Sequence, residues 1–159
     1  MEELDVEKYM REGWIRLESV FSVDQCDDLI EHMLDLKSGR KSIDGFEARD
    51  QDEWRRTHNQ HRYDQIARDW LIAPELHKPL LRCLGDEPEG IQTMYFWKGS
   101  EQGRHQDQYY LPGCMSAWIA LMDVNEDNGT IWVQSKSHER RLLTTSDFEE
   151  DGEFYEWDY

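Results

Sequence analysis

The chain is poor in positive charge and has no long apolar run. Its 159 residues contain 18 lysines and arginines against 35 aspartates and glutamates, which gives a formal net charge of -17. Nucleic acids and anionic membrane surfaces would repel such a protein, so we expect neither as a partner. No apolar stretch is long enough for a transmembrane helix, and the acidic start at Met1–Asp5 is unlike the basic start of a secretory signal.

Cysteine is also scarce. The three cysteines, Cys26, Cys83 and Cys114, lie far apart and form no Cys-x-x-Cys pair. This pattern argues against a disulfide framework and favours a reducing cytoplasm. Apolar residues make up 38% of the chain and aromatic residues 12%, which suffices for a core, so we expect residues 1–159 to form one domain.

The first helices are indicated by their end signals. Residues 4–11 are expected to form a short helix that ends at Gly13, and Ser22 and Gln25 form a capping box for a longer helix that stops near Gly39. That longer helix carries apolar residues at helical spacing, which we predict to be core. They are Val23, Cys26, Leu29, Ile30 and Met33.

The next segments alternate between polar and helical patterns. Residues 38–59 are polar and contain glycine, which predicts a long loop near the mouth of a site. Residues 63–84 are helical in pattern, and we expect Pro74 and Pro79 to interrupt them before Gly85 closes the helix.

Three strand patterns follow in the second half of the chain. Residues 90–98 are aromatic and β-branched, as strands are. Residues 114–123 and 130–134 are apolar runs of strand length joined by a segment that ends in Asn128-Gly129. Because Asn-Gly supplies the positive φ angles of a tight turn, these two runs predict a β-hairpin.

His105 and Asp107 are the candidate metal ligands. In an extended segment, residues two apart point to the same face, so the two side chains can meet at one ion. They would supply two ligands of a 2-His-1-carboxylate facial triad for Fe(II), which needs one further histidine. The neighbouring Gln106 and Tyr109 are candidates for substrate contact or for support of the ligands.

The remaining histidines fit less specific roles. His58 and His61 lie three apart in an arginine-rich segment, which favours a solvated or substrate-contacting role over a metal site. His32 falls on the polar side of the capped helix and His77 lies beside Pro79, so we interpret both as surface residues.

The order of these motifs resembles the phytanoyl-CoA dioxygenase-like family of Fe(II)/2-oxoglutarate-dependent oxygenases, from about Val6 to His138. The matching motifs are Gln92-x-Met94, Lys98, His105-Gln106-Asp107, Ala117-Trp118 with Asp123, Asn128-Gly129 and Ser137-His138. The resemblance implies an α+β fold, a double-stranded β-helix (a cupin-like jelly roll) with N-terminal buttressing helices. It divides the chain into a mainly helical part, residues 1–88, and a part with barrel strands and an acidic insertion, residues 89–159.

The resemblance also implies a chemistry. Fe(II) would be bound by His105 and Asp107, and Met94 and Trp118 occupy positions that line the 2-oxoglutarate pocket in the family. The implied reaction is hydroxylation of a small organic substrate coupled to decarboxylation of 2-oxoglutarate. Family members that halogenate lack the carboxylate, so Asp107 favours hydroxylation.

The same resemblance predicts an incomplete site. The family's second iron-binding histidine and its 2-oxoglutarate-binding arginine follow later, whereas His138 is the only histidine after Gly129 and falls in a turn motif. The chain is then a fragment or a natural truncation, or His138 has become the third ligand. Residues 147–159 hold seven acids, no bases and five aromatics, which predicts a surface insertion.

Three function classes stay open on these grounds. They are an oxygenase, a non-catalytic jelly-roll remnant or interaction module, and a cupin-like metal enzyme without 2-oxoglutarate. An incomplete barrel predicts exposed strand edges, and hence a complementary C-terminal chain or a homo-oligomer as partner.

Overall fold

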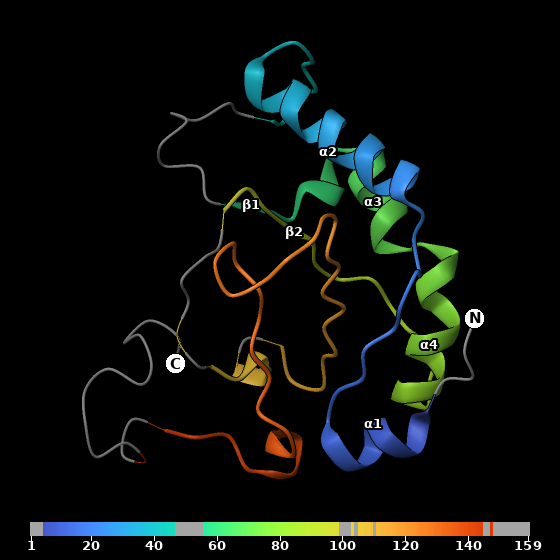
Figure 1. The fold of residues 1–159 in the computed structure, drawn as a ribbon, viewed down its shortest axis with the longest axis vertical. Helices are drawn as coiled ribbons and strands as arrows, with labels where there is room; N and C mark the ends of the chain where they lie inside the picture. Colours follow the sequence, from blue (N-terminus) through green and yellow to red (C-terminus); the bar gives the residue numbers. More distant parts are fainter. Residues whose placement is uncertain are drawn as a thin grey trace. The chain divides into compact units, whose positions relative to one another are not determined.

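The computed structural model describes residues 5–46, 56–98, 103, 105–109, 111–144 and 147 (Figure 1). Their helices and strands, in chain order, are α1 (Val6–Glu12), α2 (Val23–Ser38), β1 (Arg56–His58), the 3-10 helix η1 (Gln60–Arg62), α3 (Gln65–Leu71), α4 (Pro74–Leu84), β2 (Met94–Phe96), η2 (Asp107–Tyr109) and η3 (Ser137–Glu139). No helix in this described part is long and apolar enough to cross a membrane. Most of the predicted acidic insertion, residues 148–159, lies outside the described residues.

The chain divides into two compact units. The first consists mainly of residues 16–100 and 119–130, and the second of residues 5–15, 101–118 and 131–159. The single domain with a mainly helical part, residues 1–88, and a part with barrel strands, residues 89–159, stays a prediction. The jelly roll itself stays a prediction, because the described residues contain one two-stranded sheet.

Helix α2 of the first unit has well-defined ends. Its predicted capping box is confirmed: the Ser22 hydroxyl accepts from the Gln25 backbone N–H at 3.2 Å, and the Gln25 side chain accepts from the Ser22 N–H at 2.8 Å. The helix ends at Gly39, which has a left-handed φ of 73°. Val23 was wrongly predicted as core: as the first residue of the helix, it is 74% exposed.

The core lies on one face of α2. Leu29, Met33 and Leu36 are buried there, at the helical spacing that the sequence indicates. Partly buried side chains from α3, β2 and neighbouring segments pack against them. These are Ile43, Phe46, Ile66, Trp70, Tyr95, Trp97 and Leu121.

The two strands are antiparallel, with Thr57 opposite Tyr95 and His58 opposite Met94. Strand β2 confirms part of the strand expected at residues 90–98. Strand β1, in contrast, falls within residues 38–59, which we expected to be a loop; residues 47–55 of that segment lie outside the described residues. The pairing with β2, which is distant in sequence, makes this short segment a strand.

The prolines differ in their effect on the helices. Pro74 is the first residue of α4, where its missing N–H breaks no helical bond, and Gly85 ends the helix with a φ of 75°. The predicted interruption at Pro79 is wrong, because α4 continues through it. Pro79 is the buried residue of that helix, so burial of its ring offsets the lost backbone bond.

The predicted turn at residues 125–129 forms, but the flanking strands do not. The Asn125 carbonyl accepts hydrogen bonds from the N–H groups of Asn128 at 3.3 Å and Thr130 at 3.1 Å. Residues 114–123 and 130–134 carry no strand pairing in the described structure. Accordingly, Ile131, Trp132 and Val133 are all exposed, with Trp132 at 80%.

In the second unit, the turn around η3 closes the C-terminal end of α1. The Lys136 N–H donates to the Glu12 carbonyl at 2.7 Å, and the His138 Nε2 lies 3.0 Å from the Met10 carbonyl, to which it donates. These bonds satisfy carbonyls that have no partner within the helix. Gly13 ends α1 with a φ of 81°, and a Cβ placed there would lie 2.3 Å from His138 Nδ1.

Replacing Gly13 by alanine is therefore expected to destabilise the protein by about 2–5 kcal/mol. The positive φ costs about 1–2 kcal/mol, and displacement of His138 adds about 1–3 kcal/mol. Gly113→Ala is the matched control: its φ is 74°, but no described atom lies within 4 Å of the added Cβ. Urea unfolding measures the free energy of unfolding of both variants. An equal loss in the two would show that the contact with His138 does not contribute to stability.

Candidate metal centre

His105 and Asp107 come together as predicted, but through a different local structure. His105 Nε2 lies 3.3 Å from Asp107 Oδ1. The prediction that this segment is extended is wrong, because Asp107 begins the 3-10 helix η2. The Gln106 and Asp107 carbonyls accept from the N–H groups of Tyr109 and Leu111, both at 3.1 Å, so local backbone bonds replace strand pairing.

A separate hydrogen bond orients each candidate ligand. His105 Nδ1 lies 2.9 Å from the Gly103 carbonyl, which can only accept, so Nδ1 carries the proton. A neutral His105 ring then presents the Nε2 lone pair toward Asp107. The Ser116 hydroxyl donates to Asp107 Oδ2 at 2.7 Å and leaves Oδ1 facing the histidine. Such supporting bonds are typical of metal ligands.

The charge at Asp107 suits a cation. When His105 is also protonated on Nε2, its hydrogen bond lowers the pKa of the Asp107 carboxyl, burial raises it, and the Ser116 hydroxyl and the charge of the protonated ring lower it further, so that it lies below its usual value. The carboxylate is therefore ionised at neutral pH. Two lone pairs that face each other at 3.3 Å repel unless a proton or a metal ion lies between them.

The geometry fits a divalent metal ion. Two ligands about 2.1 Å from one ion and at right angles to each other are about 3 Å apart, close to the observed separation. The side chains of His105 and Asp107 are 27% and 48% exposed, so an ion can reach them from solvent.

Gln106 joins this segment to residues 141–143. Its side-chain nitrogen donates to the Arg141 carbonyl at 3.3 Å, and its oxygen accepts from the Leu143 N–H at 2.7 Å. Both ends of the amide are thus bonded to backbone, which positions the turn beside the ligands. Tyr109 is half-buried at the end of η2. Contact of either residue with substrate stays a prediction.

No third ligand joins the pair in the described part of the chain. No group of three or more histidine, cysteine, aspartate or glutamate side chains there could hold a metal ion. The possibility that His138 is the third ligand is not supported, because its Nε2 is bonded to the Met10 carbonyl and its Nδ1 faces Gly13.

Met94 and Trp118, expected to line the cosubstrate pocket, are both partly exposed. Met94 begins β2 and is 44% exposed, and Trp118 is 41% exposed. Met94 belongs to the first unit, while Trp118 belongs to the second, together with His105 and Asp107. A common pocket for these side chains stays a prediction.

Two of the remaining histidines bond to the segment before β2. His58, on β1, accepts from the Gln92 side-chain nitrogen at 2.6 Å, and the His61 Nδ1 lies 3.0 Å from the Thr93 hydroxyl. The predicted surface position of His77 is confirmed: its side chain is 48% exposed and lies 2.7 Å from Glu87 Oε1.

His32 was wrongly predicted as a surface residue. It is 6% exposed, and its Nε2 lies 2.7 Å from Oδ2 of Asp64, which is 3% exposed. Lys41 Nζ donates to His32 Nδ1 at 2.8 Å, so Nε2 carries the proton that is donated to Asp64. Gln60 also donates to Asp64 Oδ2, and Asp64 Oδ1 accepts from the Ile66 N–H at 3.0 Å, which caps α3.

The sequence did contain a signal for this buried network. His32 follows Leu29 by three positions and precedes Leu36 by four, which places it on the apolar face of α2. A histidine on such a face needs a polar partner, and Asp64 directly precedes a helical pattern as an N-cap would.

The comparisons with known proteins point to one family. Residues 9–158 match the family described as Phytanoyl-CoA dioxygenase (PhyH). The match extends beyond His138, where we expected the resemblance to end. No solved structure matches the chain significantly.

Curated relatives agree with this match. "Phytanoyl-CoA dioxygenase 1" of Oryza sativa subsp. japonica is 29% identical over 93 residues, which cover 54% of this chain and 33% of the relative. "Phytanoyl-CoA dioxygenase domain-containing protein 1" of Mus musculus is 32% identical over 93 residues, 52% of this chain and 32% of the relative. The protein of that name from Danio rerio is 23% identical over 201 aligned positions, 89% of this chain and 68% of the relative.

The matches to the rice and mouse proteins thus span about a third of those proteins' lengths. The family match, in contrast, covers nearly the whole of this chain. The motifs around His105 and Asp107 lie within the matched residues. The chain belongs to the phytanoyl-CoA dioxygenase family.

Proposed function

We propose that the chain is the part of an Fe(II)/2-oxoglutarate-dependent dioxygenase that carries the first two iron ligands, and that the enzyme hydroxylates a small organic substrate. The observation that carries the proposal is the convergence of His105 Nε2 and Asp107 Oδ1 at 3.3 Å. Fe(II), when bound together with 2-oxoglutarate and O2, would supply the chemistry that oxidises the substrate C–H bond.

The protein's own residues hold and orient the reactants in this proposal. His105 and Asp107 bind the metal ion, while the Gly103 carbonyl and the Ser116 hydroxyl fix the orientation of the two ligands. Met94 and Trp118 line the cosubstrate pocket. Gln106 holds residues 141–143 beside the site, and Tyr109 contacts the substrate.

Completion of the site requires residues beyond these. His138, the other histidine of the same unit, is bonded to the Met10 carbonyl and does not join His105 and Asp107. We therefore propose that the third ligand and a 2-oxoglutarate-binding arginine come from polypeptide outside residues 1–159, either a C-terminal segment or another chain. The exposed run Ile131–Val133 supports this, because an unpaired apolar segment suits strand pairing with such a segment.

The cytoplasm is the proposed compartment. The three cysteines are free thiols in the structure: Cys26, Cys83 and Cys114. Burial raises the pKa of all three thiol groups, which keeps them protonated and unreactive. Free thiols of this kind are typical of a reducing compartment.

Succinate release from 2-oxoglutarate tests the proposal. Residues 1–159 alone, supplied with Fe(II), ascorbate and O2, should release no succinate above background, because two ligands hold Fe(II) poorly. The chain joined to the C-terminal part of a longer relative should release succinate, and His105→Ala or Asp107→Ala should abolish this activity. If the joined protein folds, binds Fe(II) and still releases none, the chain belongs to a non-catalytic member of the family.

A further inference from the structure

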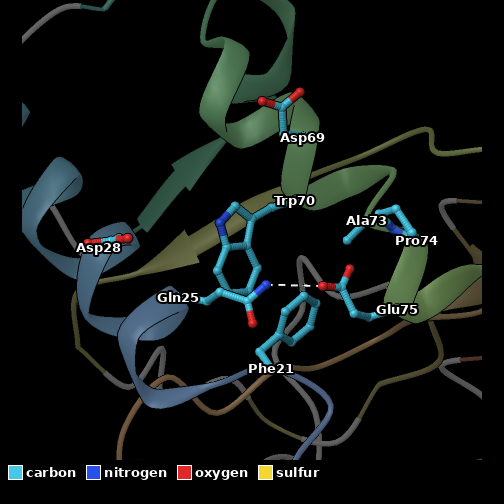
Figure 2. A pocket seen from close by; sticks show the side chains of 8 residues that line it. All are labelled: Phe21, Gln25, Asp28, Asp69, Trp70, Ala73, Pro74 and Glu75. Carbon is cyan, nitrogen blue, oxygen red and sulfur yellow. Dashed lines mark hydrogen bonds between the residues drawn. The ribbon is translucent and has the colours of Figure 1, made fainter.

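A pocket in the first unit has no place in the proposed oxygenase site. It has a volume of about 300 Å³ and lies between the start of α2 and the junction of α3 with α4 (Figure 2). Its lining residues are Phe21, Gln25, Asp28, Asp69, Trp70, Ala73, Pro74 and Glu75. None of these residues is shared with the candidate metal centre.

Two aromatic rings form one wall of the pocket. The ring centroids of Phe21 and Trp70 are 4.4 Å apart, with an angle of 30° between the ring planes. Trp70 also packs against the buried core residues of α2, and this packing holds its ring in place. Both rings line the pocket and are only partly buried.

The rest of the pocket is acidic. Asp28, Asp69 and Glu75 contribute three carboxyl groups, and the lining residues include no lysine, arginine or histidine. The Gln25 side-chain nitrogen donates to Glu75 Oε1 at 3.0 Å, a bond that connects α2 to α4 in Figure 2. The Glu75 backbone N–H and Gln25 lower the pKa of the Glu75 carboxyl, so it stays ionised at neutral pH.

We propose that this pocket binds a small organic ammonium cation. The faces of aromatic rings attract cations, most strongly quaternary and alkylated ammonium groups, and tryptophan is the best such ring. Carboxylates around the rings add charge complementarity, while the apolar ring surface accommodates the methyl groups of the ligand. A volume of about 300 Å³ is near the lower end for ligand pockets and suits a ligand of few atoms.

Titration with choline, followed by 19F NMR of protein labelled with 5-fluorotryptophan, tests this proposal. The Trp70 resonance is assigned by its loss in Trp70→Phe. Choline should shift this resonance in a saturable manner, whereas 3,3-dimethylbutan-1-ol, its uncharged analogue of the same shape, should bind at least about ten-fold more weakly. Equal binding of the two compounds would overturn the proposal, as would an equal shift of the resonance by Mg²⁺.

Charge variants separate the pocket from the general negative charge of the chain. Asp28→Asn combined with Asp69→Asn keeps the shapes of the side chains and should weaken choline binding at least about ten-fold. Glu126→Gln combined with Asp127→Asn removes the same charge from exposed positions that do not line the pocket, and should leave binding unchanged. Equal weakening by both pairs would show that choline responds to net charge alone and would refute a specific site.

Discussion

Asp64→Ala is expected to lower the free energy of unfolding by about 3–5 kcal/mol, because it breaks a buried pair and leaves His32 without its acceptor. The same change removes the N-cap of α3 and the acceptor for Gln60. Asp64→Asn keeps an oxygen at the cap and should cost less. Urea unfolding of the three proteins measures the differences.

Asp69→Ala provides the control on the same helix. Asp69 is exposed, and its carboxylate bonds to Gln65 within α3, so its loss should cost less than about 1 kcal/mol. A similar loss of stability for Asp64→Ala and Asp69→Ala would contradict the role assigned to the buried network.

The network also predicts how stability changes with pH. Burial alone raises the pKa of Asp64, but the hydrogen bonds from His32, Gln60 and the Ile66 N–H hold it below the ordinary value of 3.8. A lowered pKa in the folded state means that the stabilising contribution of Asp64 is present in full above pH 3.8 and is lost as the pH falls through the folded-state value. The difference in the free energy of unfolding between the parent protein and Asp64→Asn should therefore become smaller only below pH 3.8, as the pH falls through the folded-state pKa of Asp64.

Metal binding by residues 1–159 is expected to be weak and to depend entirely on the candidate pair. His105→Ala and Asp107→Ala should each abolish binding of Fe(II), because one remaining ligand cannot hold the ion. Ser116→Ala should weaken binding about ten-fold or more, since Asp107 Oδ2 loses its hydrogen-bond donor. Calorimetric titration without oxygen measures these affinities.

Control variants distinguish this site from general attraction of cations by the acidic chain. Glu87→Gln removes an exposed carboxylate that bonds to His77 and should leave Fe(II) affinity unchanged. Retention of full affinity in both His105→Ala and Asp107→Ala would place the bound metal elsewhere.

Local sequence signals predicted the helix ends well. The capping box at Ser22 and Gln25 and the glycine ends at Gly13 and Gly39 involve residues only a few positions apart, so the sequence itself contains the interaction. Features that depend on distant partners were harder to predict. Strand β1 exists because Thr57 pairs with Tyr95, and no pattern within residues 56–58 indicates that pairing.

The candidate site illustrates the same limit. The spacing of His105 and Asp107 correctly predicted that they converge, but the cause is the turn at η2, not strand alternation. His32 was missed because its acceptor, Asp64, is 32 positions away and its burial depends on the packing of α2. Motif order, in contrast, identified the family because it does not depend on local geometry.

The most direct test of the metal pair is NMR of the six histidine rings during titration with Mn²⁺, a paramagnetic substitute for Fe(II). The His105 ring signals should broaden first, and Asp107→Asn should remove this selectivity while the protein remains folded. If His105 broadens no more than His77, or if broadening is unchanged in Asp107→Asn, then His105 and Asp107 do not form a metal site.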